Sequence, residues 1–136
     1  MAAVDFVEGR ERRRARLNEY SYLVIGAAQK VHGRLGFGFL EKVYERALCL
    51  ELAAKGVDFR QQGAIEVVYD GRIIGAYVPD LVVERSVVVE IKAVDRLEII
   101  HRRQCLNYLR ASDFRLGLVL NFGRSRLEVA RLVNNF

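Results

Sequence analysis

The spacing of apolar residues predicts two helices in the first third of the chain. Val24, Ala28 and Val31 recur at helical spacing, which predicts a helix over residues 17–33. A glycine-rich loop follows, and a second helix is predicted over about 39–55. The apolar face of the second helix is predicted to contain Leu40, Val43, Tyr44, Ala47, Leu50 and Ala54.

Beyond Gly56 the apolar pattern changes to a period of two, which is typical of strands. Asp70-Gly71 is a strong hairpin-turn signal between two such stretches. The expected elements are strands over 57–69 and 72–84, a β-branched strand over 86–92, a helix over 95–111, a strand over 114–121, and a strand or short helix over 127–133.

This order of elements predicts one α/β domain. Strands grouped around a helical crossover imply a mixed sheet flanked by helices. The 136 residues are 51% hydrophobic, enough to bury a core, and one Pro with 29% charged residues argues against disorder. Residues 1–16 are interpreted as a charged N-terminal arm, either frayed or helical, and 17–136 as the domain.

Several classes of protein do not fit the sequence. It has no run of about 18 apolar residues to span a membrane, and its charged N-terminus lacks the apolar core of a secretory signal. Cys49 and Cys105 lie in apolar-rich helical stretches and are interpreted as reduced core cysteines of a cytoplasmic protein. His32 and His101 are the only histidines, which argues against a histidine-rich zinc site.

Positive charge is concentrated late in the chain. The formal net charge is +5, and residues 101–126 contain six Arg and one acid. Such a segment suits a polyanionic partner, although an ordinary solvated face would have the same composition.

Three polar residues occupy strand positions that a buried sheet does not favour. In the strand 86–92, alternation places Glu90 and Lys92 on one face, roughly 7 Å apart. Asp80 follows Pro79 and precedes the strand 86–92 by the length of a hairpin connection. If its strand pairs with this one, two carboxylates and an ammonium meet on one face. An isolated Glu–Lys pair on an edge strand would be the plain alternative.

This combination of groups suits phosphodiester hydrolysis. Hard divalent cations prefer oxygen ligands, so Asp80, Glu90 and the backbone carbonyl of Ile91 suit Mg²⁺ or Mn²⁺. Such a cation lowers the pKa of bound water, and Lys92 can orient that water or stabilise charge on phosphate.

The helix predicted over 95–111 carries a mixed stripe that suits a helix edge facing a cleft. The stripe consists of Leu97, His101, Gln104 and Tyr108. His101 is interpreted as a hydrogen-bonded, partly buried residue. Arg102 and Arg103 lie off the stripe, where they can meet a phosphate backbone.

Two motifs resemble a known group of enzymes. Pro79-Asp80 followed by Glu90-Ile91-Lys92 resembles the signature of the PD-(D/E)XK nuclease superfamily. Segment 38–44, GFLEKVY, is similar to the motif of its GxxExxY branch. The resemblance covers nearly the whole chain and implies a restriction-endonuclease-like core.

The resemblance also implies roles for further residues. Glu41 corresponds to an extra acidic metal ligand on the helix before the sheet. Gln104 and Tyr108 resemble a Q-x-x-x-Y element that contacts nucleic acid in RecB-like and lambda-exonuclease-like nucleases. The implied activity is metal-dependent cleavage of nucleic acid, DNA rather than RNA, in a protein that can act as a homodimer. The alternative is a binding module for nucleic acid or protein on the same fold, with little or no turnover.

Overall fold

The computed structural model describes residues 2–136, with side chains from residue 7 onward. Two helices form the N-terminal third, α1 (Ala2–Leu35) and α2 (Glu41–Ala54). The remaining elements are β1 (Phe59–Gln61), β2 (Ile65–Tyr69), β3 (Arg72–Tyr77), β4 (Leu81–Val83), β5 (Val87–Lys92), α3 (Ile99–Arg110), β6 (Leu116–Asn121) and β7 (Glu128–Val133).

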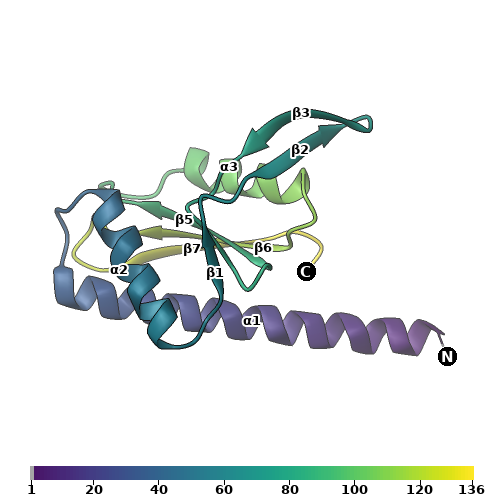
Figure 1. The fold of residues 1–136 in the computed structure, drawn as a ribbon, viewed down its shortest axis with the longest axis horizontal. Coiled ribbons are helices and arrows are strands. Elements are labelled where there is room, and N and C mark those ends of the chain that lie inside the picture. Colours follow the sequence, from purple (N-terminus) through teal and green to yellow (C-terminus); the bar gives the residue numbers. More distant parts are fainter. Residues whose placement is uncertain (1) are drawn as a thin grey trace.

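The main sheet has five strands in the order β1-β4-β5-β6-β7. β5 and β6 are parallel because α3 connects them as a crossover, and the other pairs are antiparallel. α1 and α2 cover one face of the sheet and α3 lies against the other (Figure 1). The predicted fold class, a single α/β domain with a mixed sheet and a restriction-endonuclease-like arrangement, is therefore confirmed.

Strand alternation decides which side chains of β5 reach each layer. Val87, Val89 and Ile91 are buried in the core shared with α1 and α2. Glu90 and Lys92 therefore point to the face that carries α3. β5 and β6 are covered on both faces, which accounts for their nearly continuous apolar runs.

β2 and β3 form a separate two-stranded hairpin that projects from the body (Figure 1). Asp70 and Gly71 both have positive φ, 51° and 74°, as a tight hairpin turn of type I′ requires. The predicted turn is therefore present, whereas the flanking strands are shorter than expected. Gln62, at φ 55°, and buried Gly63 separate β1 from β2, and Pro79 separates β3 from β4.

The helices also differ from the sequence prediction. Residues 2–16 of the expected arm are helical, one of its two predicted forms, and they are continuous with α1; residue 1 lies outside the described residues. α3 begins at Ile99 instead of about 95, because Glu98 and His101 form a reciprocal capping box there.

The buried face of α2 was predicted correctly at Tyr44 and Ala47 only. Leu40 and Leu50 are 80% and 74% exposed. The residues that pack inward are Tyr44, Glu45, Leu48, Cys49 and Leu52. Because apolar residues occur around most of this helix, the contacts with α1 and β5 select the inward side, and that side includes a glutamate.

Both cysteines are free and buried, as expected. Burial raises the pKa of Cys49 to about 11 and that of Cys105 to about 12, which makes both thiols poor nucleophiles. Among residues 2–136 no helix has the length and apolar character needed to cross a membrane.

Candidate functional site

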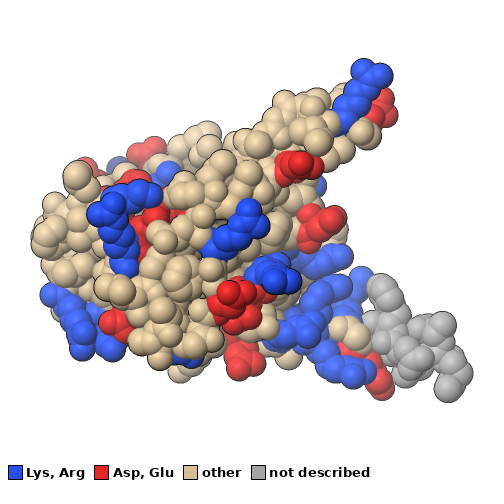
Figure 2. Space-filling model, viewed as in Figure 1, with Lys and Arg blue, Asp and Glu red and all other residues tan. Residues whose placement is uncertain are grey.

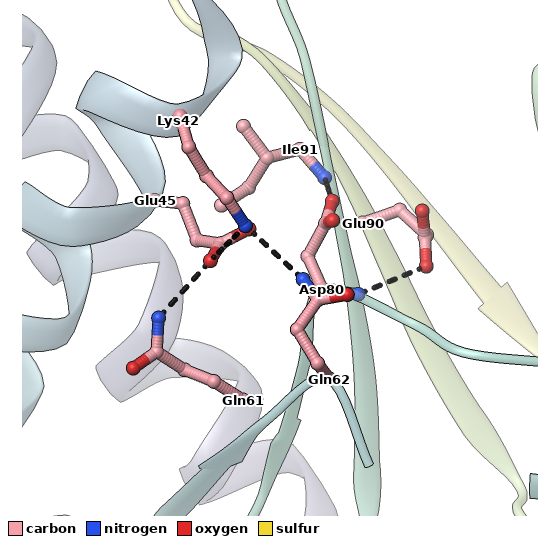
Figure 3. Close-up of polar contacts among 7 residues, drawn as sticks. All are labelled: Lys42, Glu45, Gln61, Gln62, Asp80, Glu90 and Ile91. Carbon is pink, nitrogen blue, oxygen red and sulfur yellow. Dashed lines mark hydrogen bonds and ion pairs between the residues drawn. The ribbon is translucent and has the colours of Figure 1, made fainter. Parts of the chain in front are cut away.

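Asp80 lies where β4 and β5 stop pairing. The last backbone pair joins Leu81 to Val89. One residue further, Asp80 Oδ2 accepts a hydrogen bond of 2.8 Å from the N–H of Ile91. The Asp80 N–H donates to Glu90 Oε1 at 3.3 Å (Figure 3). Side chains thus replace the backbone ladder at this point, and each carboxylate holds the backbone of the other segment.

The backbone of Ile91 is directed toward Asp80. The carbonyl of Lys92 accepts from Phe122 N on the β6 side at 2.8 Å. Because neighbouring residues of a strand direct their N–H and C=O to opposite sides, those of Ile91 point away from β6. The Ile91 N–H meets Asp80 there, and its carbonyl faces the same side of β5.

Glu90 is held by an aromatic pair. The Tyr77 hydroxyl donates a hydrogen bond to Glu90 Oε1. The Tyr77 ring stacks on that of Tyr108, with centroids 3.5 Å apart and planes inclined by 2°. Tyr108 of α3 is thus connected to Glu90 through Tyr77, a residue at the end of β3 that the sequence did not single out. Its signal was weak, a tyrosine three residues before Asp80 in an apolar strand.

In both carboxyl groups, Asp80 and Glu90, the ionised form is disfavoured, so their pKa values are raised. Burial raises the pKa of Glu90 to about 7, with Asp80 adding to the rise, while Tyr77 and Lys92 oppose it. Burial also raises the pKa of Asp80, opposed by the Ile91 N–H and Lys92, with Glu45 and Glu41 adding to the rise. Bound positive charge would favour the ionised form of both groups.

A third carboxylate, that of Glu45, is buried on the α2 side of the junction. It is 3% exposed and accepts hydrogen bonds from Lys42 at 3.1 Å, Gln61 at 3.0 Å and Gln62 at 3.4 Å. Figure 3 shows these side chains converging on Glu45 beside Asp80. The Gln62 N–H also donates to the Asp80 carbonyl at 3.1 Å. Glu45 thus connects α2 to the segment that positions Asp80.

The sequence did not single out Glu45, although one signal was present. It lies beside Tyr44 and one turn before Cys49, within the stripe that becomes the buried face. Glu41 was chosen instead. It is exposed, and it lines a cavity of about 500 Å³ together with Lys42, Glu45 and Asp80.

The other residues of the GFLEKVY segment shape the loop before α2. The Tyr44 hydroxyl donates to the Gly36 carbonyl at 2.7 Å and accepts from Phe39 N at 3.2 Å. Gly38 has a φ of 112°, which favours glycine. The tyrosine and the glycine therefore have structural roles, and they present Glu41 at the start of the helix.

Lys92 and Gln104 lie on the α3 side. They line a small cavity of about 70 Å³ whose wall also includes Glu90, Tyr77 and His101. The expectation that Asp80 meets Glu90 and Lys92 on one face needs modification. The Asp80 side chain lines the cavity toward α2, and contact with Glu90 passes through the Asp80 N–H.

The two arginines of α3 lie away from this junction, whereas His101 caps the helix beside the small cavity. His101 Nδ1 accepts from the Glu98 N–H at 3.0 Å, so it is partly buried and hydrogen-bonded as expected. Arg102 and Arg103 are exposed and line a separate hollow of about 480 Å³ with Arg110. This surface lies on a different side of α3 from Gln104 and Tyr108.

The junction offers oxygen donors that fit a divalent cation. Asp80 and Glu90 each use one carboxylate oxygen in hydrogen bonds. No buried side-chain oxygen of the described residues lacks a partner, so Asp80 Oδ1 and Glu90 Oε2 are reached by solvent. Within residues 2–136 no cluster of three His, Cys, Asp or Glu side chains is arranged around one ion. Mg²⁺, which needs only one or two carboxylates and keeps several waters, matches this donor set.

Comparison with known proteins adds a family-level finding. The family model described as PD-(D/E)XK nuclease superfamily matches residues 18–132. Searches of curated proteins and of solved structures returned no match. The matched range includes α2, the Asp80–Glu90 junction and α3.

Proposed function

The chain belongs to the PD-(D/E)XK nuclease superfamily, and on this premise we propose that it hydrolyses phosphodiester bonds with the help of a bound divalent cation. Membership supports a nuclease-like function in general. The GFLEKVY segment supports assignment to the GxxExxY branch, and DNA is the proposed substrate in preference to RNA.

The observation that carries the proposal is the hydrogen-bonded junction of Asp80, Glu90 and Ile91. It brings two carboxylates and one carbonyl to the same break in the sheet, and one oxygen of each carboxylate remains open to solvent. Raised pKa values of both carboxyl groups indicate that negative charge there is costly without a positive partner. A site with only a structural role would gain nothing from this arrangement.

Asp80 Oδ1, Glu90 Oε2 and the Ile91 carbonyl would hold Mg²⁺ or Mn²⁺. When bound, such a cation lowers the pKa of water and offsets charge on the phosphate. Lys92, on the face of Glu90, supplies positive charge to the reacting phosphate and orients the attacking water. Glu41, at the rim of the Asp80 cavity, adds a ligand or positions water.

Two residues of α3 have supporting roles. Gln104 is exposed at the mouth of the small cavity beside Glu90 and Lys92, where it can contact substrate. Tyr108 acts through the Tyr77 ring, and so holds Glu90 in place. Arg102 and Arg103 would contact the phosphate backbone of a long substrate farther from the junction.

Cleavage assays test the proposal directly. Wild type, Asp80→Asn and Lys92→Ala would be incubated with linear, circular, single- and double-stranded DNA and with RNA, in Mg²⁺, Mn²⁺ or EDTA. We expect cation-dependent cleavage that falls by on the order of 10²- to 10³-fold in both variants. Asp70→Asn, an exchange in the exposed hairpin turn, is the matched control and should retain full activity.

Equal cleavage by wild type and Asp80→Asn, or cleavage that persists in EDTA, would contradict the proposed site. Nucleic-acid binding without cleavage on any substrate would instead favour a binding module on this fold.

A further inference from the structure

Two cavities adjoin at the end of the sheet where β5 begins. The larger, about 610 Å³, lies along β1 and β4, and the smaller, about 230 Å³, lies between α1 and the loop before β6. Arg85 and Phe114 line both cavities, so the two lie side by side on one surface. This surface is called the Arg–Phe groove. Neither cavity contains a residue of the Asp80–Glu90 junction.

Positive charge dominates the groove. Its basic residues are Arg13, Arg16, Arg60, Arg85 and Arg115. Asp58 and Asp113 are the acids that line it. Figure 2 shows Lys and Arg side chains gathered along the part of α1 that extends past the body. The groove thus carries an excess of positive charge from segments that are far apart in the sequence.

The arginines repel one another. Burial lowers the pKa of Arg13, and the like charges of Arg115, Arg10, Arg14 and Arg16 lower it further. Arg115 donates to the Asn135 carbonyl at 3.0 Å, a neutral partner that leaves its charge uncompensated. Bringing these charges together costs free energy, which a polyanion in the groove would recover.

Aromatic rings are interleaved with the arginines. Phe59 of β1 and Phe114 of the loop before β6 are both partly exposed in the groove wall. Arg60 lies directly over Gly63, where a Cβ would come within 2.8 Å of Arg60 Nε. Guanidinium groups along a groove with accessible rings between them match the way proteins bind single strands, with phosphates on cations and bases stacked on aromatic side chains.

The larger cavity reaches the face of the sheet that carries Glu90, whereas Phe59 and the arginines of α1 lie on the side covered by α1 and α2. Val82 lines the larger cavity and pairs with Val88, and neither belongs to the core under α1 and α2. By alternation Val82, Val88 and Glu90 share one face. From Arg85 to Lys92 the chain spans roughly 23 Å at about 3.3 Å per residue, the length of a short run of nucleotides.

We propose that the Arg–Phe groove binds a single strand of nucleic acid and directs it along the sheet toward Glu90 and Lys92. Phosphates contact the arginines, and bases stack on Phe59 and Phe114. The inference rests on the proposed function, because it assigns the form of the substrate and the path on which that substrate is held.

Fluorescence anisotropy in EDTA tests binding without turnover. The probes are a labelled oligodeoxythymidine and a labelled duplex of the same length. The groove variant is Arg16→Gln/Arg85→Gln. The matched control, Arg46→Gln/Lys55→Gln, removes the same charge from exposed positions of α2 and its C-terminal cap, outside both cavities. Thermal unfolding checks that each variant folds.

We expect wild type and control to bind the single strand alike. In the groove variant the dependence of log K on log salt should become shallower by about 1.4, because each lost phosphate contact removes about 0.7. When salt is lowered from about 1 M to about 0.1 M, the affinity of the groove variant should therefore rise about 25-fold less than that of wild type. Phe114→Leu should weaken single-strand binding by about fivefold or more and leave duplex binding unchanged.

Three outcomes would overturn the inference: equal binding by the groove variant and wild type, equal loss in the control, or duplex binding as tight as that of the single strand. If the protein bound polyglutamate but neither nucleic-acid probe, the groove would be a binding site for an acidic protein. If the groove variant cleaves and binds like wild type, the inference fails while the nuclease stands. If binding depends on the groove but no substrate is cut, the nuclease fails while the groove stands.

Discussion

A buried carboxylate, Glu45, and a partly buried one, Glu90, lie on opposite sides of the β4–β5 junction, and their hydrogen-bond partners differ. On the α2 side, Glu45 accepts hydrogen bonds from three side chains, which use both of its oxygens. On the α3 side, Glu90 receives both of its hydrogen bonds on Oε1, and its pKa is raised to about 7.

The difference separates a structural charge from one available to a ligand. A buried carboxylate with a full set of donors contributes to stability, because the hydrogen bonds offset the loss of hydration. Glu90 lacks that compensation, so its ionised form destabilises the fold until a cation binds. Substitution of Glu45 and of Glu90, and then of Tyr77, whose hydroxyl donates a hydrogen bond to Glu90, tests this distinction.

The largest loss of stability is expected for Glu45→Ala. Removing this side chain takes away the acceptor shared by Lys42, Gln61 and Gln62, and should lower the free energy of unfolding by about 2–3 kcal/mol. Urea denaturation measures the loss. Glu41→Ala, one turn earlier and exposed, should change stability by less than about 0.5 kcal/mol. Similar losses in both variants would show that Glu45 is not a structural anchor.

A gain in stability of similar size is expected for Glu90→Gln at high pH. The folded-state pKa of about 7 exceeds the ordinary value of 4.5, so folding favours the protonated acid. This favourable contribution is fully present below about pH 4.5 and is lost as pH rises to about 7. In EDTA, Glu90→Gln should therefore be about 3 kcal/mol more stable than wild type at pH 8 and about equal at pH 4.5.

Thermal unfolding of both proteins across that pH range measures the effect. A stability difference that does not change with pH would show that Glu90 is ionised without cost. Adding Mn²⁺ should stabilise only the wild type, which sharpens the contrast between a carboxylate and its neutral analogue.

The smallest effect is expected for Tyr77→Phe, which removes a hydrogen bond to Glu90 but leaves the ring to stack on Tyr108. Stability should fall by about 1 kcal/mol. The pKa of Glu90 should rise further, so that Mn²⁺ binding, followed by calorimetry, begins at higher pH. Tyr69→Phe on the exposed part of the same hairpin is the control. An unchanged pH profile in Tyr77→Phe would exclude a role in positioning Glu90.

Much of the fold could be predicted because its signals are local. Asp70-Gly71 has the residues that a tight turn requires, and the β-branched residues of 87–91 favour a strand. Boundaries were less predictable, since the break at Gln62 and the late start of α3 depend on contacts with other segments. The assignment of α2 failed for the same reason, as its apolar residues do not define a single face.

The site could be predicted in part. Pro79-Asp80 and the pair Glu90 and Lys92 were identified from spacing, and the structure brings Asp80 into contact with both Glu90 and Ile91. Glu45 and Tyr77 were missed, because a glutamate in a helix and a tyrosine in a strand have no distinctive spacing. The roles assigned to Asp80, Glu90 and Lys92 remain predictions for the cleavage assay.

By itself the sequence determined the α/β class, the hairpin turn, and the residues that alternate along β5, since propensity and strand period act over a few neighbours. Only the tertiary structure decided which glutamate of α2 is buried, on which side of β5 each carboxylate lies, and that Arg13 and Arg16 share a groove with Arg85 and Arg115. Those outcomes depend on which distant segments pack together, and the balance of burial against hydrogen bonding is set only when they meet.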